Sequence, residues 1–275
     1  MIMNSKIKIA WYGKHFGEEP PLVGEKGAGA IFFSGCNLKC AFCQNWQISH
    51  EDLGDLYSIE ELADIMLKLQ SDGAANIDLV TPTPWRRQIK EAIAIAKAKG
   101  LSIPIAWNSN AYESVSAIKD MEGLIDIYLP DFKYGDDEAA VKYSHALKYS
   151  EVADKAIREM YRQVGKLEIG KNGLAKRGLI VRHMILPGNL NNSLLALEKL
   201  AAIDKGIHLS LMSQYNPVYG AKSFNEINRR VLEDEVAAID DRKWEIGLEN
   251  GWVQEADSAD IFLPDFNSSN PFEKK

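Results

Sequence analysis

The chain of 275 residues carries a formal net charge of -7, and 46% of its residues are hydrophobic. This size suffices for one sizeable domain or a single α/β barrel, and a second full domain is not expected. The acidic balance gives no basic surface for nucleic acid or an anionic membrane, and no apolar run is long enough to span a bilayer. The first residues lack the apolar core of a signal peptide, so we expect a soluble, cytoplasmic protein.

Residues 1–29 are expected to form an N-terminal extension. Apolar residues alternate between positions 7 and 11, and Gly and Pro residues are dense from there to residue 29. This pattern predicts a short strand and turns, with a small hairpin ahead of the first core strand. His15, Glu18 and Glu19 fall among these turns. They line the mouth of a site or belong to a solvated loop, and composition alone favours the loop.

Residues 30–215 are expected to form the core domain, because strand-like runs alternate there with helix-like runs. This order is typical of an α/β fold with a parallel sheet and crossover helices. The start of the first long helix is well defined, since Ser58 and Glu61 form a capping-box pattern. The predicted strands are residues 30–33, 76–80, 103–107, 125–129, 179–186 and 207–212. The predicted helices are residues 59–72, 85–99, 114–121, 152–164 and 192–204.

Residues 216–275 are expected to form a C-terminal helical cap and tail. Residues 225–246 are strongly charged and helix-like, with several apolar residues, Trp244 among them, available to face the core. Residues 251–254 are strand-like, and residues 261–266 form a hydrophobic patch in a polar tail. We expect this patch to dock onto the rest of the chain.

All three cysteines of the chain, Cys36, Cys40 and Cys43, fall in one stretch with the spacing C-x3-C-x2-C. Three thiolates on one tight loop can ligate three irons of a cubane [4Fe-4S] cluster. With no fourth cysteine in the chain, the fourth iron is open to another ligand. The alternatives are a structural zinc site completed by a histidine such as His50, and unrelated buried thiols. A disulfide is less favoured, because the cysteine count is odd and the chain is expected inside the cell.

The same stretch resembles the cluster motif of the radical S-adenosylmethionine (SAM) superfamily, C-x3-C-x-aromatic-C, with Phe42 as the aromatic residue. In that superfamily the amino and carboxylate groups of SAM chelate the open iron, and one electron from the cluster splits SAM to a 5'-deoxyadenosyl radical. The segments HFGEEP at 15–20, GAGAIFFSG at 27–35 and CQNW at 43–46 further resemble a branch similar to pyruvate formate-lyase activating enzyme. The resemblance implies a partial (β/α)6 barrel, open on one side.

Ligands of such a barrel bind at the C-terminal ends of its strands, and this rule selects the candidate residues. The candidates for contact with SAM, by this rule and by the resemblance, are Phe42, Thr81, Thr83, Asn108, Ser109, Asp131, Lys133, Arg182, Met212 and Gln214. Thr81 and Thr83 belong to a Thr-Pro-Thr-Pro segment that stands where the family has a glycine-rich motif. Prolines lack N–H donors, so the SAM amine would be met there by carbonyls or threonine hydroxyls.

Other candidates have more specific expected roles. The sequence Asp131-Phe132-Lys133 resembles the D-x-K of glycyl-radical activating enzymes, which implies that Lys133 binds the SAM carboxylate and Asp131 a sulfonium, a hydroxyl or a monovalent cation. The alternative is a salt bridge at the barrel rim. Arg182 interrupts an apolar strand, so we expect it to point inward and meet an anion or a carboxylate. His183, its neighbour, then points to the other face as a hydrogen-bonded core residue.

Met212 and Gln214 lie where the superfamily places adenine contacts, although packing is the alternative for a methionine. Trp252 and Gln254 resemble a terminal motif of the same branch, which implies a role at the substrate opening.

The sequence leaves three functions open. The first is activation of a glycyl-radical enzyme, as in the [formate-C-acetyltransferase]-activating family that the chain resembles. The second is radical modification of a small molecule, and the third is a non-catalytic iron–sulfur redox or binding module. The resemblance implies a low-potential electron donor such as flavodoxin or ferredoxin as a partner, and a glycyl-radical enzyme for the first function only.

Overall fold

The computed structural model describes residues 6–254 and 263–273. Within these residues the strands are β1 Lys6–His15, β2 Ala28–Phe33, β3 Asp55–Ser58, β4 Ile77–Val80, β5 Ile105–Ser109, β6 Ile127–Pro130, β7 Glu168–Ile169, β8 Ala175–Met184, β9 His208–Met212 and β10 Gly251–Val253. The α-helices are α1 Pro20–Val23, α2 Trp46–Ser49, α3 Ile59–Ser71, α4 Arg86–Ala98, α5 Val115–Lys119, α6 Asp137–Ser144, α7 Tyr149–Val164, α8 Leu190–Ala201 and α9 Glu233–Glu245. Three short 3-10 helices are η1 Thr83–Trp85, η2 Tyr219–Ser223 and η3 Asn225–Ile227.

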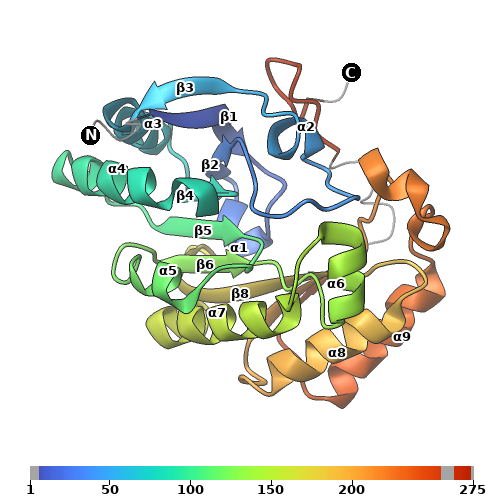
Figure 1. Ribbon diagram of the computed structural model, residues 1–275. Helices are drawn as coiled ribbons and strands as arrows, with labels where there is room; N and C mark the ends of the chain where they lie inside the picture. Colours follow the sequence, from blue (N-terminus) through green and yellow to red (C-terminus); the bar gives the residue numbers. More distant parts are fainter. Residues whose placement is uncertain (1–5, 255–262, 274–275) are drawn as a thin grey trace.

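The strands form one sheet in the order β10-β9-β8-β6-β5-β4-β2-β1-β3, and β7 pairs with β8 off this path. All pairs from β2 to β10 along this path are parallel, and β1 pairs antiparallel with β2 and β3. Helices α4, α5, α7 and α8 cover the outer face of the curved sheet (Figure 1). The predicted α/β fold with a partial parallel barrel is therefore confirmed, and all six predicted core strands are present.

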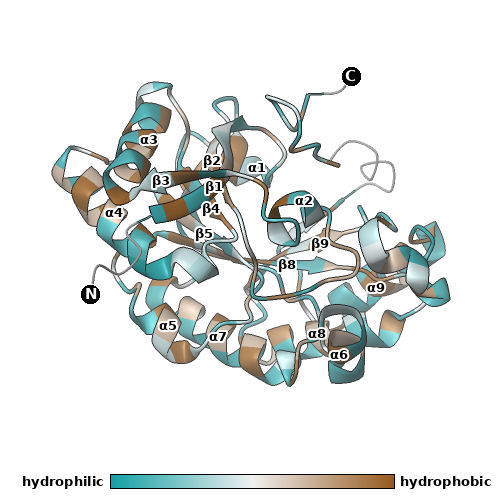
Figure 2. Cartoon of the chain, turned by 45° about the horizontal axis from the view of Figure 1, so that its top comes forward, coloured by the Kyte–Doolittle hydropathy of each residue, from teal (hydrophilic) through white to brown (hydrophobic). Residues whose placement is uncertain are grey.

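Helix α3 forms where the capping box predicts it. Ser58 Oγ accepts a hydrogen bond from the Glu61 amide, and the Glu61 carboxylate accepts one from the Ser58 amide. The buried side chains of this helix lie on one face, as its spacing of apolar residues requires. Figure 2 shows hydrophobic and hydrophilic stretches alternating along α4 and α7, which indicates the same division into a buried and a solvated face. The helices thus hold the sheet from outside and leave its inner face to the site.

The structure differs from the prediction in several elements. Helix α6 was not predicted, and α7 begins at Tyr149 rather than at residue 152. The predicted helix over residues 225–246 is broken into η3 and α9, and Glu235 bonds Arg229 and the Leu232 amide at the start of α9. The prediction that Trp244 faces the core was wrong, because its side chain is 52% exposed and the buried Lys243 lies over its ring.

Two strands outside the predicted core join the sheet. The N-terminal strand β1 extends it by antiparallel pairing, and β10 adds a parallel strand beside β9. In the tail, Phe266 is buried against Phe32, whereas Leu263 is exposed. Ile261 and Phe262, which belong to the predicted docking patch, lie outside the described residues. The domain boundaries after residues 29 and 215 stay a prediction.

Every helix of the described ranges is too short or too polar to cross a membrane.

Candidate active site

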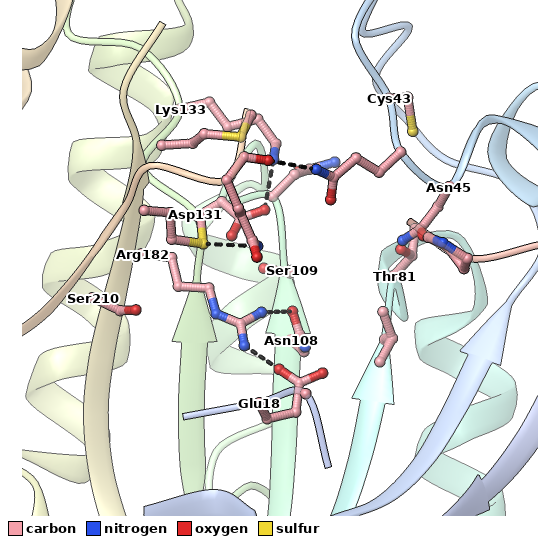
Figure 3. A pocket seen from close by; sticks show the side chains of 18 of the residues that line it. Glu18, Cys43, Asn45, Thr81, Asn108, Ser109, Asp131, Lys133, Arg182 and Ser210 are labelled. Carbon is pink, nitrogen blue, oxygen red and sulfur yellow. Dashed lines mark hydrogen bonds and ion pairs between the residues drawn. The ribbon is translucent and has the colours of Figure 1, made fainter. Parts of the chain in front are cut away.

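A cavity of about 560 Å³ opens at the C-terminal ends of the parallel strands. Four parts of the chain line it: the strand ends, the cysteine loop, the segment after β1, and the C-terminal residues around β10 and the tail. Figure 3 shows the cysteine loop and the strand ends facing each other across this space. The cavity therefore lies where the barrel rule predicts ligands.

The three cysteines are free, and all of them line the cavity. Their loop is held by backbone hydrogen bonds, from Gly35 to the carbonyl of Ile48 and from Ala41 to that of Tyr143. Burial raises the pKa of Cys40 to about 11 and that of Cys43 to about 12, so cluster binding must displace protons from these thiols.

Polar groups lie beside two of the sulfur atoms. Asn110 Nδ2 and the Leu38 amide each donate to Cys36 Sγ across 3.4 Å, and N–H donors of this kind stabilise thiolate ligands. Ser49 Oγ lies 3.0 Å from Cys43 Sγ and donates its hydrogen to the Asn45 carbonyl. Within the described ranges, no three His, Cys, Asp or Glu side chains converge to hold one metal ion. A cubane takes each thiolate on a different iron, so its ligands need only face a shared volume, which these cysteines do.

Phe42 closes one side of the cysteine loop. Its ring is buried and packs against Tyr134 and Tyr215. It lines the cavity beside the cysteines, as the motif implies. This apolar packing limits the access of water to a group bound at the loop.

Asp131 and Lys133 form an ion pair inside the cavity. Lys133 Nζ lies 2.6 Å from Asp131 Oδ2, and the two side chains are 19% and 21% exposed. The Lys133 amide donates to the Tyr149 hydroxyl, which fixes the backbone after β6. Burial, the largest single effect, lowers the pKa of Lys133, but the charge of Asp131, its hydrogen bond and the nearby Cys40 and Cys43 together raise this pKa. The lysine is thus a cation that faces the cysteine loop and remains available to an anion.

Arg182 points into the barrel and meets carboxylates, as its position in an apolar strand predicts. Its Nε and Nη2 each lie 2.7 Å from a carboxylate oxygen of Glu19, and Nη2 also contacts Glu18. Nη1 donates to Asn108 Oδ1 across 3.3 Å. The guanidinium is thus paired with carboxylates of this chain, and its predicted contact with SAM or substrate stays a prediction.

The solvated-loop interpretation of His15, Glu18 and Glu19 was wrong. The two glutamate side chains are 7% and 5% exposed, and all three residues line the cavity. His183 lies on the opposite face of β8, where it is buried and bonded to the Phe132 carbonyl and to Ser193 Oγ. Local composition could not identify the two glutamates, because their partner Arg182 is more than 160 residues away in the chain.

The Thr-Pro-Thr-Pro segment is divided between the cavity and the core. Thr81 lines the cavity, but its φ of 60° is left-handed, so the extended conformation that Pro82 favours for it is not adopted. Thr83 is not among the lining residues, and its hydroxyl donates to Glu113 Oε1 across 3.0 Å. The expected contact of Thr83 with the SAM amine is therefore not supported. Ser109 and Asn108 line the cavity as predicted, although the Ser109 hydroxyl donates to Glu113.

Met212 and Gln214 line the cavity at the end of β9. Gln44 is the residue after Cys43. Its Nε2 donates to the Gln214 carbonyl across 2.9 Å and so connects the cysteine loop to the end of β9. Trp252 and Gln254 line the same cavity. Asn110, which directly follows Ser109 and belongs to the strand-end residues that the barrel rule selects, also lines it. The lining residues that the sequence did not indicate include Gln44, Asn45, Met184, Ser210, Pro264 and Phe272.

Comparison with known proteins gives the fold and the family. The chain is similar to SuiB from Streptococcus suis, solved with S-adenosylmethionine bound, with a TM-score of 0.53 and 11% identity over 84% of this chain and 48% of that one. It is also similar to TYW1, solved with a lysine-pyruvate adduct, with a TM-score of 0.52 and 14% identity over 88% of this chain and 84% of that one. At these identities the likeness shows the fold alone.

A sequence relative and a family model go further. The uncharacterized protein MJ0674 of Methanocaldococcus jannaschii is 31% identical over 248 residues, which are 84% of this chain and 66% of that protein. The chain thus spans slightly less than two thirds of the length of this relative. Residues 30–201 match the model of the Radical SAM superfamily. These residues are more than half of the chain, and the chain therefore belongs to the radical SAM superfamily.

Proposed function

We propose that this chain cleaves SAM reductively and abstracts a hydrogen atom from a substrate held in the same cavity. The superfamily implies a [4Fe-4S] cluster and SAM, and it implies an enzyme rather than a non-catalytic iron–sulfur module. When bound, these groups supply an electron and a 5'-deoxyadenosyl radical. The observation that carries the proposal is that all three thiols and the Asp131–Lys133 pair line one cavity.

Different residues of this chain bind the cluster and SAM. Cys36, Cys40 and Cys43 hold the cluster through their sulfur atoms, since each of them faces the cavity. Lys133 supplies a cation for the carboxylate of SAM, because it is charged and its side chain reaches the space beside the cysteines. Asp131 orients this ammonium and offers its remaining oxygen to a sulfonium, a hydroxyl or a monovalent cation.

The strand ends hold the rest of SAM. Met212 and Gln214 at the end of β9 provide an apolar surface and an amide for the adenine. Thr81, Asn108 and Ser109 line the wall between the cysteine loop and Arg182. Only one threonine of the segment after β4 is in reach, so an amine bound there meets Thr81 rather than Thr83.

Activation of a glycyl-radical enzyme is the first candidate reaction. It is supported by the segments around the cysteines and by the Asp131-Phe132-Lys133 sequence, whose two charged side chains face the cavity. This reaction needs a protein partner that presents a backbone glycine. A low-potential donor such as flavodoxin or ferredoxin in the cytoplasm supplies the electron in either candidate reaction.

Modification of a small molecule is the second candidate, and one observation favours it. The cavity continues past the cysteines to a charged region at Glu18, Glu19 and Arg182, which a polypeptide glycine has no group to match. The C-terminal residues Trp252 and Phe272 line the same space. The cavity is thus better matched by a compact polar molecule than by a loop of a protein.

The test is an anaerobic assay of the reconstituted chain with dithionite and SAM, in which 5'-deoxyadenosine is measured. We expect its formation to depend on the cluster and on reductant. A chain that carries a full cluster, binds SAM and forms no 5'-deoxyadenosine under reduction would overturn the proposal. Candidate glycyl-radical partners are added in a second arm, where a stable organic radical on the partner, seen by electron paramagnetic resonance, separates the two reactions.

A further inference from the structure

The charged group at the end of the cavity consists of Glu18, Glu19 and Arg182, and so has two carboxylates for one guanidinium. Glu19 takes both Nε and Nη2 of Arg182 in a bidentate pair, which matches one negative charge to one positive charge. Glu18 adds a second carboxylate, which contacts Arg182 through Oε2. Its other oxygen, Oε1, lies 3.8 Å from His15 Nε2, beyond hydrogen-bond distance. Among the described residues, Glu18 Oε1 therefore has no hydrogen-bond donor, and Glu18 shares its one guanidinium partner, Arg182, with Glu19.

His15 does not supply the missing positive charge. Burial lowers the pKa of His15, and this effect exceeds the opposite effect of Glu18, so the ring is neutral at pH 7. A neutral histidine leaves the excess negative charge in place. The nearby acidic side chains of Asp78 and Asp131 supply no positive charge either.

Asp78 lies behind the cavity wall, next to this charged group. Its side chain is fully buried on β4, and its Oδ2 accepts from Asn108, whose own Oδ1 accepts from Arg182. Its Oδ1 is buried without a hydrogen-bond partner. Asp78 is not itself among the residues that line the cavity and contacts it through Asn108, so its unpaired oxygen adds to the excess of acceptors behind this wall. Burial, and then the charge of Glu18, raises the pKa of Asp78 well above its usual range.

The walls next to Glu18 are aromatic. The Phe272 ring lies 4.1 Å from the His15 ring and 5.2 Å from Phe32, and all three side chains line the cavity with Glu18. Figure 3 shows Glu18 at the opposite end of the drawn site from Cys43. An inorganic cation prefers a shell of several oxygens, whereas an organic ammonium is matched by a carboxylate together with apolar and aromatic surface.

We propose that the cavity at Glu18 binds a positively charged organic group of the substrate, of the primary ammonium class, with Glu18 as its counter-ion. The N–H donors of this group bond the free oxygen of Glu18, and the carbon chain lies against Phe32 and Phe272 on the way to the cluster end. Glu18 thus selects the substrate, while Arg182 and Glu19 hold Glu18 in place. The inference rests on the proposed function only in taking the bound molecule as the substrate.

The test is a binding titration of the anaerobically reconstituted chain, with SAM present, followed by ligand-observed NMR. The probes are n-butylammonium and 2-phenylethylammonium, with n-butanol and 2-phenylethanol as uncharged counterparts and KCl as an inorganic cation. We expect saturable binding of the ammonium probes, at least roughly tenfold tighter than that of the alcohols. Binding of the ammonium probes is expected to be independent of SAM concentration.

Glu18→Gln removes the unmatched charge and leaves the Arg182–Glu19 pair neutral, so the variant keeps its fold. We expect it to lose the preference for ammonium over alcohol, while Glu25→Gln, at an exposed residue after α1, keeps this preference. Equal binding of ammonium and alcohol probes, unchanged selectivity in Glu18→Gln, saturation by KCl alone, or competition between SAM and the ammonium probes would each overturn the inference. None of these readouts uses SAM cleavage, so a failure of the proposed reaction is distinguishable from a failure of this site.

Discussion

The side-chain amide of Asn110 donates a hydrogen bond to Cys36 Sγ across 3.4 Å. The second N–H of the same amide bonds Asn37 Oδ1, and its carbonyl oxygen accepts from the Tyr112 amide, so the orientation of the side chain is fixed. The residue directly after Ser109, at the end of β5, thus contacts the cysteine loop. It links the strand that lines the SAM region to a proposed cluster ligand.

Asn110→Ala is expected to lower the reduction potential of the bound cluster. An N–H donor to a thiolate ligand stabilises the more negative, reduced state, so its loss makes reduction harder, on the order of tens of millivolts. A redox titration monitored by electron paramagnetic resonance measures the shift. Asn172→Ala, in the exposed turn between β7 and β8, is the control and leaves the potential unchanged. An unaltered potential in Asn110→Ala would show that this contact does not influence the cluster.

Cys36→Ala, Cys40→Ala and Cys43→Ala are each expected to lose the intact cluster. The chain holds no fourth cysteine that replaces a lost ligand. Reconstituted wild-type protein is expected to carry close to four irons per chain, measured by iron and sulfide analysis with the visible absorption spectrum. Lys39→Ala, an exposed change within the same loop, keeps the full iron content. Protein that takes up zinc and shows no iron–sulfur absorption after reconstitution would contradict this assignment.

Lys133→Ala is expected to weaken SAM binding and to keep the iron. The lost contact between an ammonium and a carboxylate costs on the order of 1.5 to 3 kcal/mol, or roughly ten- to hundredfold in affinity. SAM binding is measured on the reconstituted protein by calorimetry, with Lys142→Ala as a control because Lys142 forms a surface ion pair with Glu226. SAM affinity equal to that of the wild type would show that Lys133 serves only to pair Asp131.

Thr81→Gly is expected to raise the free energy of unfolding by about 1 kcal/mol, because a β-branched residue is strained at positive φ and glycine is not. The φ of Thr81 is 60°, and its hydroxyl has no hydrogen bond to another described residue that the change removes. Thr83→Gly serves as the comparison. It is expected to lower the free energy of unfolding, since it removes the hydroxyl that donates to buried Glu113. Denaturant unfolding measures both changes, and a destabilised Thr81→Gly would mean that its side chain makes a stabilising contact. If SAM binding also weakens in Thr81→Gly, the hydroxyl is a SAM contact.

His183 is expected to make the fold sensitive to acid. Burial lowers its pKa to about 4, against the opposing effects of the Phe132 carbonyl and Asp131, while Lys133 acts in the same direction as burial. The folded state therefore prefers the neutral ring, whose stabilisation is present above about pH 6.5 and is lost as the pH falls towards 4. The full loss is on the order of 3 kcal/mol.

Denaturant unfolding at a series of pH values tests this prediction on wild type and His183→Gln. The variant is less stable at pH 7 but loses less stability between pH 6.5 and 4, because glutamine does not titrate. Parallel pH profiles of the two proteins would assign the acid sensitivity to other groups.

The sequence was sufficient to predict the cysteine motif and most helices and strands of the core. The cysteine spacing, the alternation of strands with helices and the capping box at Ser58 are short-range patterns, and each reports a single loop or element. Arg182 and His183 were also assignable to opposite faces, because the alternation of a strand is fixed by its geometry. Where the pattern was weak, as at α6 and across residues 228–232, the predicted boundaries failed.

The tertiary structure alone decided that Glu18 and Glu19 line the cavity and that Thr83 does not. Glu18 and Glu19 look like residues of a solvated turn, and they are buried only because the segment after β1 crosses the cavity to Arg182 on β8. Thr83 looks like a site residue by its position after β4, but the turn of η1 directs it to buried Glu113. The sequence determined the elements and the cysteine motif through contacts between near neighbours. The pairing of charges across the cavity depends on contacts between distant residues, which only the folded chain brings together.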